Sequence, residues 1–119
     1  MSENQKYSAI YLKFLSLHQA VREMSHFSTI DPVEDHLLRM LANVWHQEKQ
    51  ITVLEAMHLS ENISPTTLHR RLMSLRSKDL ISLQVSKSDN RVKYVIPTNL
   101  TQTYFAALGS AMVCAQKQG

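Results

Sequence analysis

Residues 63–96 read ISPTTLHRRLMSLRSKDLISLQVSKSDNRVKYVI, and this stretch decides the fold that we expect. Ser64-Pro65 is typical of a helix start, because serine accepts hydrogen bonds from the first amides and proline suits the first turn. Segments 80–85 and 92–96 are rich in β-branched residues and are separated by polar turn residues, which predicts a β-hairpin. The sequence therefore predicts a helix over 65–78 followed at once by a hairpin.

Four more helices are predicted around this stretch from helical apolar spacing and from capping residues such as Asp31 and Thr52. They are expected over about 6–24, 31–46, 52–60 and 98–116. The resulting fold is mainly α with a small β-hairpin wing, in the order ααααββα. This is the order of a winged helix-turn-helix, and we expect one domain over 1–119 with a DNA-binding core at 31–96.

The helix predicted over 65–78 has two faces at 100° per residue. Leu68, Leu72 and Leu75 share one face, while hydroxyl-bearing residues and Arg70 share the opposite one. An arginine there can present a bidentate fork to guanine in the major groove. With the basic residues that follow, the side chains predicted to contact DNA are Ser64, Thr66, Thr67, His69, Arg70, Arg71, Ser74, Lys87, Arg91 and Lys93.

Positive charge is concentrated in the same part of the chain. The formal net charge is only +3, yet residues 64–93 hold seven Lys and Arg against two Asp, so the remainder is slightly acidic. The hairpin tip over 86–91 suits a wing laid along the DNA backbone, with Arg91 in the minor groove. Asp89 is expected to orient Arg91 through a salt bridge.

Residues 63–72, ISPTTLHRRL, and the wing residues Asp89-Asn90-Arg91 resemble the MarR-like winged-helix regulators of bacteria. The resemblance implies that His69 and Arg70 face the major groove, that Arg91 serves the wing, and that the terminal helices build a dimer. Asp79 stands where that family usually has a glycine after this helix. We therefore expect a sequence-specific transcriptional regulator that binds a pseudo-palindromic, double-stranded operator as a homodimer.

The first helix carries the apolar surface expected of a dimer interface. Apolar residues recur along it at spacings of three and four, and Tyr11, Leu12 and Leu15 lie off that line. The helix therefore needs more than one packing partner, and a second subunit is one candidate. The residues predicted at the interface are Tyr7, Tyr11, Phe14, Leu15, Tyr104 and Leu108.

Other classes of function are less consistent with the residues. The two glycines are scattered and cannot form a phosphate-binding loop, and the six histidines show no compact pairing, so we expect neither an enzyme nor a metal or other cofactor. No apolar run approaches the length of a membrane span, and the lone Cys114 has no intrachain partner. We expect a cytoplasmic, nucleoid-associated protein.

Three alternatives stay open at this point. A winged helix can also serve as a protein-interaction or replication-initiation module, since a fold does not dictate its function. Trp45, Met40 and Leu41 could line a pocket for a small-molecule effector, although such residues at helical spacing usually fill a core. Cys114 could sense oxidants, but no cation cluster beside it would lower the pKa of its thiol.

Overall fold

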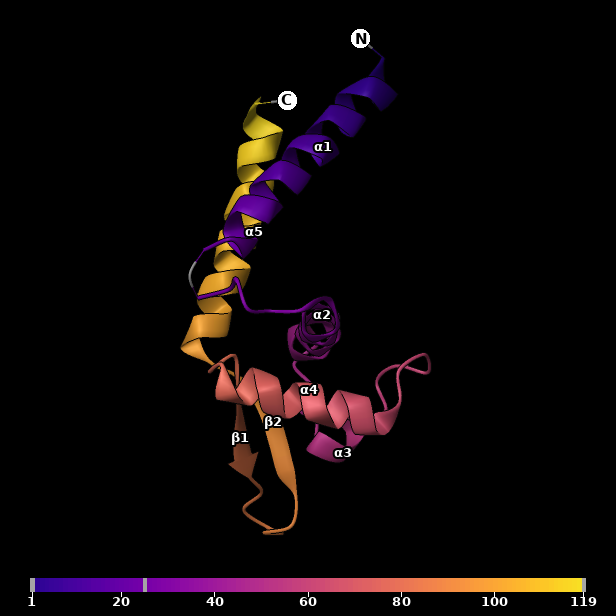
Figure 1. Cartoon of the computed structure of the whole chain (residues 1–119), viewed down its shortest axis with the longest axis vertical. Coiled ribbons are helices and arrows are strands. Elements are labelled where there is room, and N and C mark those ends of the chain that lie inside the picture. Colours follow the sequence, from indigo (N-terminus) through magenta and orange to yellow (C-terminus); the bar gives the residue numbers. More distant parts are fainter. Residues whose placement is uncertain (1, 25, 119) are drawn as a thin grey trace. The chain divides into compact units, whose positions relative to one another are not determined.

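The computed structural model describes residues 2–24 and 26–118. Its elements are α1 (Glu3–Arg22), α2 (Pro32–His46), α3 (Val53–Ala56), α4 (Pro65–Ser77), β1 (Ile81–Val85), β2 (Lys93–Pro97) and α5 (Asn99–Gln118). Figure 1 shows this mainly helical chain with its β-hairpin, as the sequence predicts. The backbone forms two compact units, one over 30–101 and the other over 1–29 and 102–119.

Three helices begin with the same reciprocal cap. In each, the side chain of the cap residue accepts a hydrogen bond from the backbone amide three residues later, and the side chain of that later residue accepts one from the cap residue's own amide. The pairs are Ser2 with Gln5, Asp31 with Glu34, and Thr52 with Glu55. Because of the cap at Ser2, α1 starts three residues before its predicted start at Lys6, and it ends at Arg22 rather than Met24. The short α3 ends at Ala56, four residues before the predicted end.

The core of the 30–101 unit forms where α2, α3, α4 and the hairpin meet. The apolar side chains with the least exposed surface there are Leu37, Leu38, Leu41, Ala56, Leu68, Leu72, Leu75, Leu80, Ile81 and Val95. The Trp45 indole donates to the Val95 carbonyl at 3.1 Å, which joins α2 to β2. Leu41 and Trp45 thus contribute to this core.

The two strands pair antiparallel, with Ile81 opposite Pro97, Leu83 opposite Val95 and Val85 opposite Lys93. The second strand includes Pro97, one residue beyond the predicted end, where its missing N–H costs no central ladder bond. The amide of Val95 also donates to the Ile51 carbonyl at 2.8 Å. The segment before α3 is therefore tied to the wing.

The turn from α4 into β1 depends on one left-handed residue. Asp79 has a φ of 61°, and the Leu80 amide donates back to the Leu75 carbonyl at 2.9 Å. This is the Schellman arrangement, in which glycine is usual at the left-handed position because it has no Cβ. This geometry explains why the resemblance implies a glycine at this position, and Asp79 adopts the same conformation without being glycine.

The terminal unit has a small interior. Phe27 and Tyr104 pack with ring centroids 4.6 Å apart, and Ala111 and Ala115 of α5 are buried. By contrast, α1 has no buried residue in any part that the structure describes. Four of its large apolar side chains, Tyr7, Tyr11, Leu12 and Leu15, therefore remain exposed within one chain.

Candidate DNA-binding surface

The start of α4 is held by a hydroxyl pair. The Ser64 side chain accepts from the Thr67 amide at 3.2 Å and donates to the Thr67 hydroxyl at 2.9 Å. Pro65 occupies the first turn, as the sequence predicts. Two of the side chains predicted to contact DNA are thus bonded to each other, and both lie beside the amides of a helix start that favour a phosphate.

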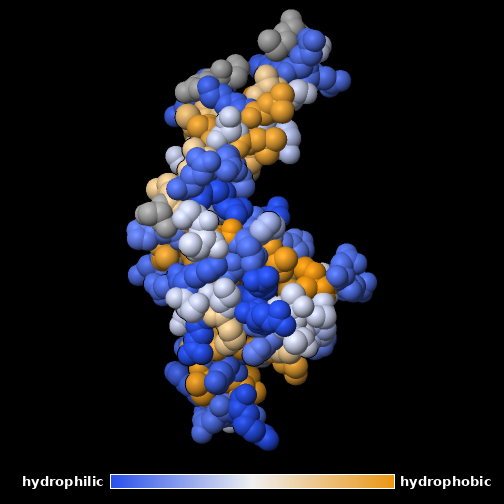
Figure 2. All heavy atoms as spheres, viewed as in Figure 1, coloured by the Kyte–Doolittle hydropathy of each residue, from blue (hydrophilic) through white to orange (hydrophobic). Residues whose placement is uncertain are grey.

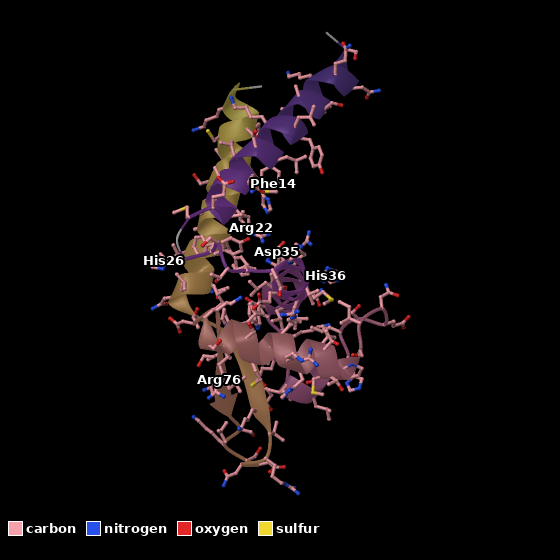
Figure 3. All side chains as sticks on the ribbon, viewed as in Figure 1. Phe14, Arg22, His26, Asp35, His36 and Arg76 are labelled. Atoms are coloured by element: carbon pink, nitrogen blue, oxygen red, sulfur yellow. The ribbon has the colours of Figure 1, made fainter. Side chains whose placement is uncertain are left out.

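The two predicted faces of α4 are present in the structure. Leu68, Leu72 and Leu75 are fully buried against the rest of the 30–101 unit. The polar side chains that remain exposed along the helix are Thr66, His69, Arg70, Arg76 and Ser77. Figure 3 shows the side chains of α4, with Arg76 labelled near the end of the helix that leads into the hairpin.

Ser74 requires a correction, because it belongs to the contact between α4 and α2. Its hydroxyl donates to Glu34 Oε2 at 2.6 Å, and the Lys78 ammonium lies 2.6 Å from Glu34 Oε1. Ser74 lies at the edge of the polar face rather than at its centre, so its hydroxyl contacts Glu34 of α2. We therefore no longer expect this hydroxyl to contact a base.

Arg71 is also engaged by α2. Its Nη1 atom lies 2.7 Å from Asp31 Oδ2, with both side chains about one-third exposed. Since Asp31 caps α2, the pair links α4 to the start of α2. The prediction of Arg71 as a DNA contact is thus weakened.

Glu34 is the residue that sequence reasoning missed. The capping box predicts its bond to the Asp31 amide, which measures 2.9 Å, but the sequence gives no sign of its other partners. The side chain is 1% exposed, and its two oxygens also accept from Ser74 and Lys78. Glu34 therefore fixes how α4 lies on α2, and with it the direction of the exposed face.

The tip of the wing carries cations and is held by hydrogen bonds between Asp89 and Arg91. Asp89 accepts from the Arg91 amide at 3.0 Å and from Arg91 Nε at 3.2 Å, which confirms the predicted salt bridge. These bonds lower the pKa of the Asp89 carboxyl below its usual value. The Arg91 side chain is still 91% exposed, and Lys87 and Lys93 are exposed as well. The tip can therefore contact a polyanion.

A groove of about 790 Å³ separates α4 from α3 and the hairpin. Its basic lining residues are His69, Arg76, Arg91 and Lys93. Its apolar lining residues are Val53, Leu54, Met57, Met73, Leu83 and Val92. The groove thus combines an apolar interior with the same basic groups that the helix and wing expose.

Comparison with solved structures identifies this arrangement. A MepR mutant from S. aureus, bound to an oligodeoxyribonucleotide, aligns at a TM-score of 0.69 with 19% identity, over 99% of this chain and 81% of that one. Transcriptional regulator Tm0710 from Thermotoga maritima aligns at 0.66 with 12% identity, over 96% and 78%. The chain has the winged-helix fold of the MarR-family transcriptional regulators.

The heme sensor protein PefR from Streptococcus agalactiae, in complex with heme, shares this MarR-type fold at a TM-score of 0.60 and 18% identity, over 99% of this chain and 79% of that one. No family model and no curated protein matches the chain.

In the MarR-type fold of this chain, the predicted dimer residues differ in how far they are exposed. Tyr7, Tyr11 and Leu15 on α1 are 63%, 59% and 41% exposed, and Phe14 and Leu108 are half-buried. Tyr104 is 1% exposed and packs on Phe27, so its prediction as an interface residue is wrong. Figure 2 shows apolar residues at the surface along α1.

The described residues were also compared with the requirements of a metal site, a cysteine site and a membrane span. No three of the His, Cys, Asp and Glu side chains that the structure describes are grouped to hold a metal ion. Cys114 is half-buried and lines an apolar groove of about 290 Å³ with Leu17, Val21 and Ala111. Within residues 2–24 and 26–118, no helix has the length and hydropathy needed to cross a bilayer.

Proposed function

We propose that this chain is a sequence-specific, double-stranded DNA-binding transcriptional regulator. In this proposal α4 enters the major groove, and the wing tip over 86–91 lies along the backbone or in the minor groove. The observation that carries the proposal is the division of α4 into a buried leucine face and an exposed face with Thr66 and Arg70, beside a wing with exposed cations. The DNA-bound MepR mutant of the same fold supports it.

Each exposed residue has a chemical role in this proposal. Arg70 donates a bidentate pair of hydrogen bonds to guanine O6 and N7, and Thr66 and His69 flank it. Lys87 and Lys93 neutralise phosphates, while Arg91 enters the narrow minor groove in the orientation that Asp89 gives it. Base contacts thus come from the helix, and positioning contacts come from the wing.

The proposal includes a homodimer built from the terminal helices. The argument is the apolar surface of α1, where Tyr7, Tyr11 and Leu12 are each more than half exposed in the single chain. Soluble proteins rarely leave such a contiguous surface without a partner. A two-fold axis would place two copies of α4 about one helical turn of DNA apart. We accordingly expect Leu15→Asp to give monomers that bind the operator weakly.

The test is selection from a pool of random double-stranded DNA with the purified protein, followed by sequencing. Salt near 0.15 M partly screens nonspecific attraction to phosphate. An enriched pseudo-palindrome supports a dimeric regulator, which in a bacterium would work in the cytoplasm at the nucleoid. If the folded protein enriches no sequence, the proposal fails and a protein-interaction or replication-initiation module becomes the better account. A controlling small molecule would need a separate search.

A further inference from the structure

The outward stripe of α4 contains one apolar residue among polar ones. Thr66, Arg70, Met73 and Ser77 follow one another at spacings of four, three and four, so they share one side of the helix. Thr66, Arg70 and Ser77 are exposed, whereas Met73 is half-buried. A methionine in the middle of a polar stripe is not explained by the burial of the opposite leucine face.

Met73 borders the groove between α4, α3 and the hairpin. Val53, Met57, Leu83 and Val92 line the same groove, so Met73 belongs to a continuous apolar surface that opens toward solvent. A small apolar group placed there would lose contact with water on several sides. It would gain dispersion contacts with a thioether that adapts its shape easily.

The charges around the groove select among occupants. His69, Arg76, Arg91 and Lys93 line it, while its one carboxylate, Glu55, already accepts from the Thr52 amide at 3.0 Å. An excess of basic groups favours a polyanion over a basic or purely apolar ligand. The occupant that fits both the cations and the apolar interior is DNA that carries an apolar group into the groove.

Thymine supplies that group, because its C5 methyl is the apolar feature that the major groove presents. We propose that Met73 receives a thymine methyl next to the base pair read by Arg70, so that α4 reads shape and hydrophobicity as well as hydrogen bonds. This inference rests on the proposed function, since it requires α4 to lie in a major groove. It adds a specificity-determining residue to the polar readers.

The experiment removes the methyl group alone. Each thymine of the selected half-site is replaced in turn by deoxyuridine, which keeps every hydrogen-bonding group. Burial of one methyl is worth a factor of about four in affinity. We expect the wild-type dissociation constant to rise about fourfold at one thymine per half-site and to change little at the others.

Two variants assign the effect to its partner. Met73→Ala shortens the side chain, and Met73→Gln keeps its length but makes it polar, so that a folded comparison remains if one variant is unstable. In both, deoxyuridine and thymine should bind equally at the position that matters to the wild type. Met40→Ala is the matched control, because Met40 is, like Met73, a half-buried methionine, but it lies on α2 and does not line the groove. This control should keep the wild-type preference for thymine.

The outcomes separate this inference from the proposed function. If the wild-type protein binds its operator tightly and no thymine shows a methyl effect, the inference is overturned and the proposed function stands. A methyl effect that persists in both Met73 variants likewise overturns the assignment to Met73. If no operator is enriched at all, both fail together. Loss of the effect in the two Met73 variants and its retention in Met40→Ala is the result we expect.

Discussion

Replacing Glu34 should destabilise the protein far more than replacing its counterpart Glu55. Both residues occupy the third position of a capping box, and each accepts one bond from the cap amide, at 2.9 Å and 3.0 Å. They differ in what else they touch. Glu34 is 1% exposed and accepts from Ser74 and Lys78, whereas Glu55 is an exposed residue on α3.

The magnitude follows from these contacts. Loss of a capping bond costs about 1 kcal/mol, which Glu55→Ala should show. Glu34→Ala also leaves Ser74 and Lys78 without their carboxylate, and hydrogen bonds to charged groups contribute about 1.5 to 3 kcal/mol each. Lys78 is 25% exposed, so its ammonium can regain water and offset part of the loss. We expect about 3 kcal/mol for Glu34→Ala, and less for Glu34→Gln, which keeps one acceptor.

The assay is urea unfolding followed by circular dichroism, at one protein concentration for all variants because a dimer's apparent stability depends on concentration. Lys78→Met, alone and combined with Glu34→Ala, completes a double-mutant cycle. We expect a coupling energy of at least about 1 kcal/mol between the two residues. Glu34→Ala and Glu55→Ala that agree within about 0.5 kcal/mol would refute the reasoning.

The remaining predictions concern binding, backbone strain and assembly. Arg70→Ala should weaken operator binding by about 1 to 3 kcal/mol and relax the preference at one base pair. Lys87→Ala should weaken binding to all DNA sequences alike and reduce the slope of log affinity against log salt concentration by about 0.9. Binding titrations at several salt concentrations would show both effects. Asp79→Gly should stabilise the chain by up to about 1 kcal/mol in urea unfolding, because its φ is 61°, while Asp79→Ala should give no gain. Tyr11→Asp should produce monomers in sedimentation velocity, and Leu54→Asp, at a similarly exposed leucine on α3, should leave the dimer intact.

Helix α4 and the wing could be predicted because the sequence patterns that indicate them are local. A cap and a proline mark the start of α4, three leucines at helical spacing mark its buried face, and β-branched segments mark the strands. The salt bridge between Asp89 and Arg91 joins residues two apart, so it too could be anticipated. Features that depend on residues close together in sequence can thus be predicted from residue patterns and conformational propensities.

The corrections concern contacts between elements distant in sequence. Ser74 shares the polar half of α4, but its partner Glu34 lies 40 residues earlier, and only the crossing of α2 and α4 decides that they meet. Tyr104 lies on a face of α5 that the periodicity identifies as apolar, yet nothing local indicates that Phe27 covers it. Periodicity tells which face is buried, but the partner that buries it depends on the tertiary structure.

The position of α4 relative to the wing is set by residues that contact no DNA in our proposal. Asp79 turns the chain from α4 into β1, and Leu80 returns an amide to Leu75 and buries its side chain in the core. The Thr98 hydroxyl donates to the Asp79 carbonyl at 2.6 Å, and the buried Thr101 hydroxyl donates to the Leu80 carbonyl. The chain that leaves β2 is therefore bonded to the turn between α4 and β1, and these residues form one corner of the fold. Base contacts from α4 and phosphate contacts from the wing must form together on one duplex. A change at this corner should therefore weaken both sets at once, whereas a change at a contact residue weakens only its own.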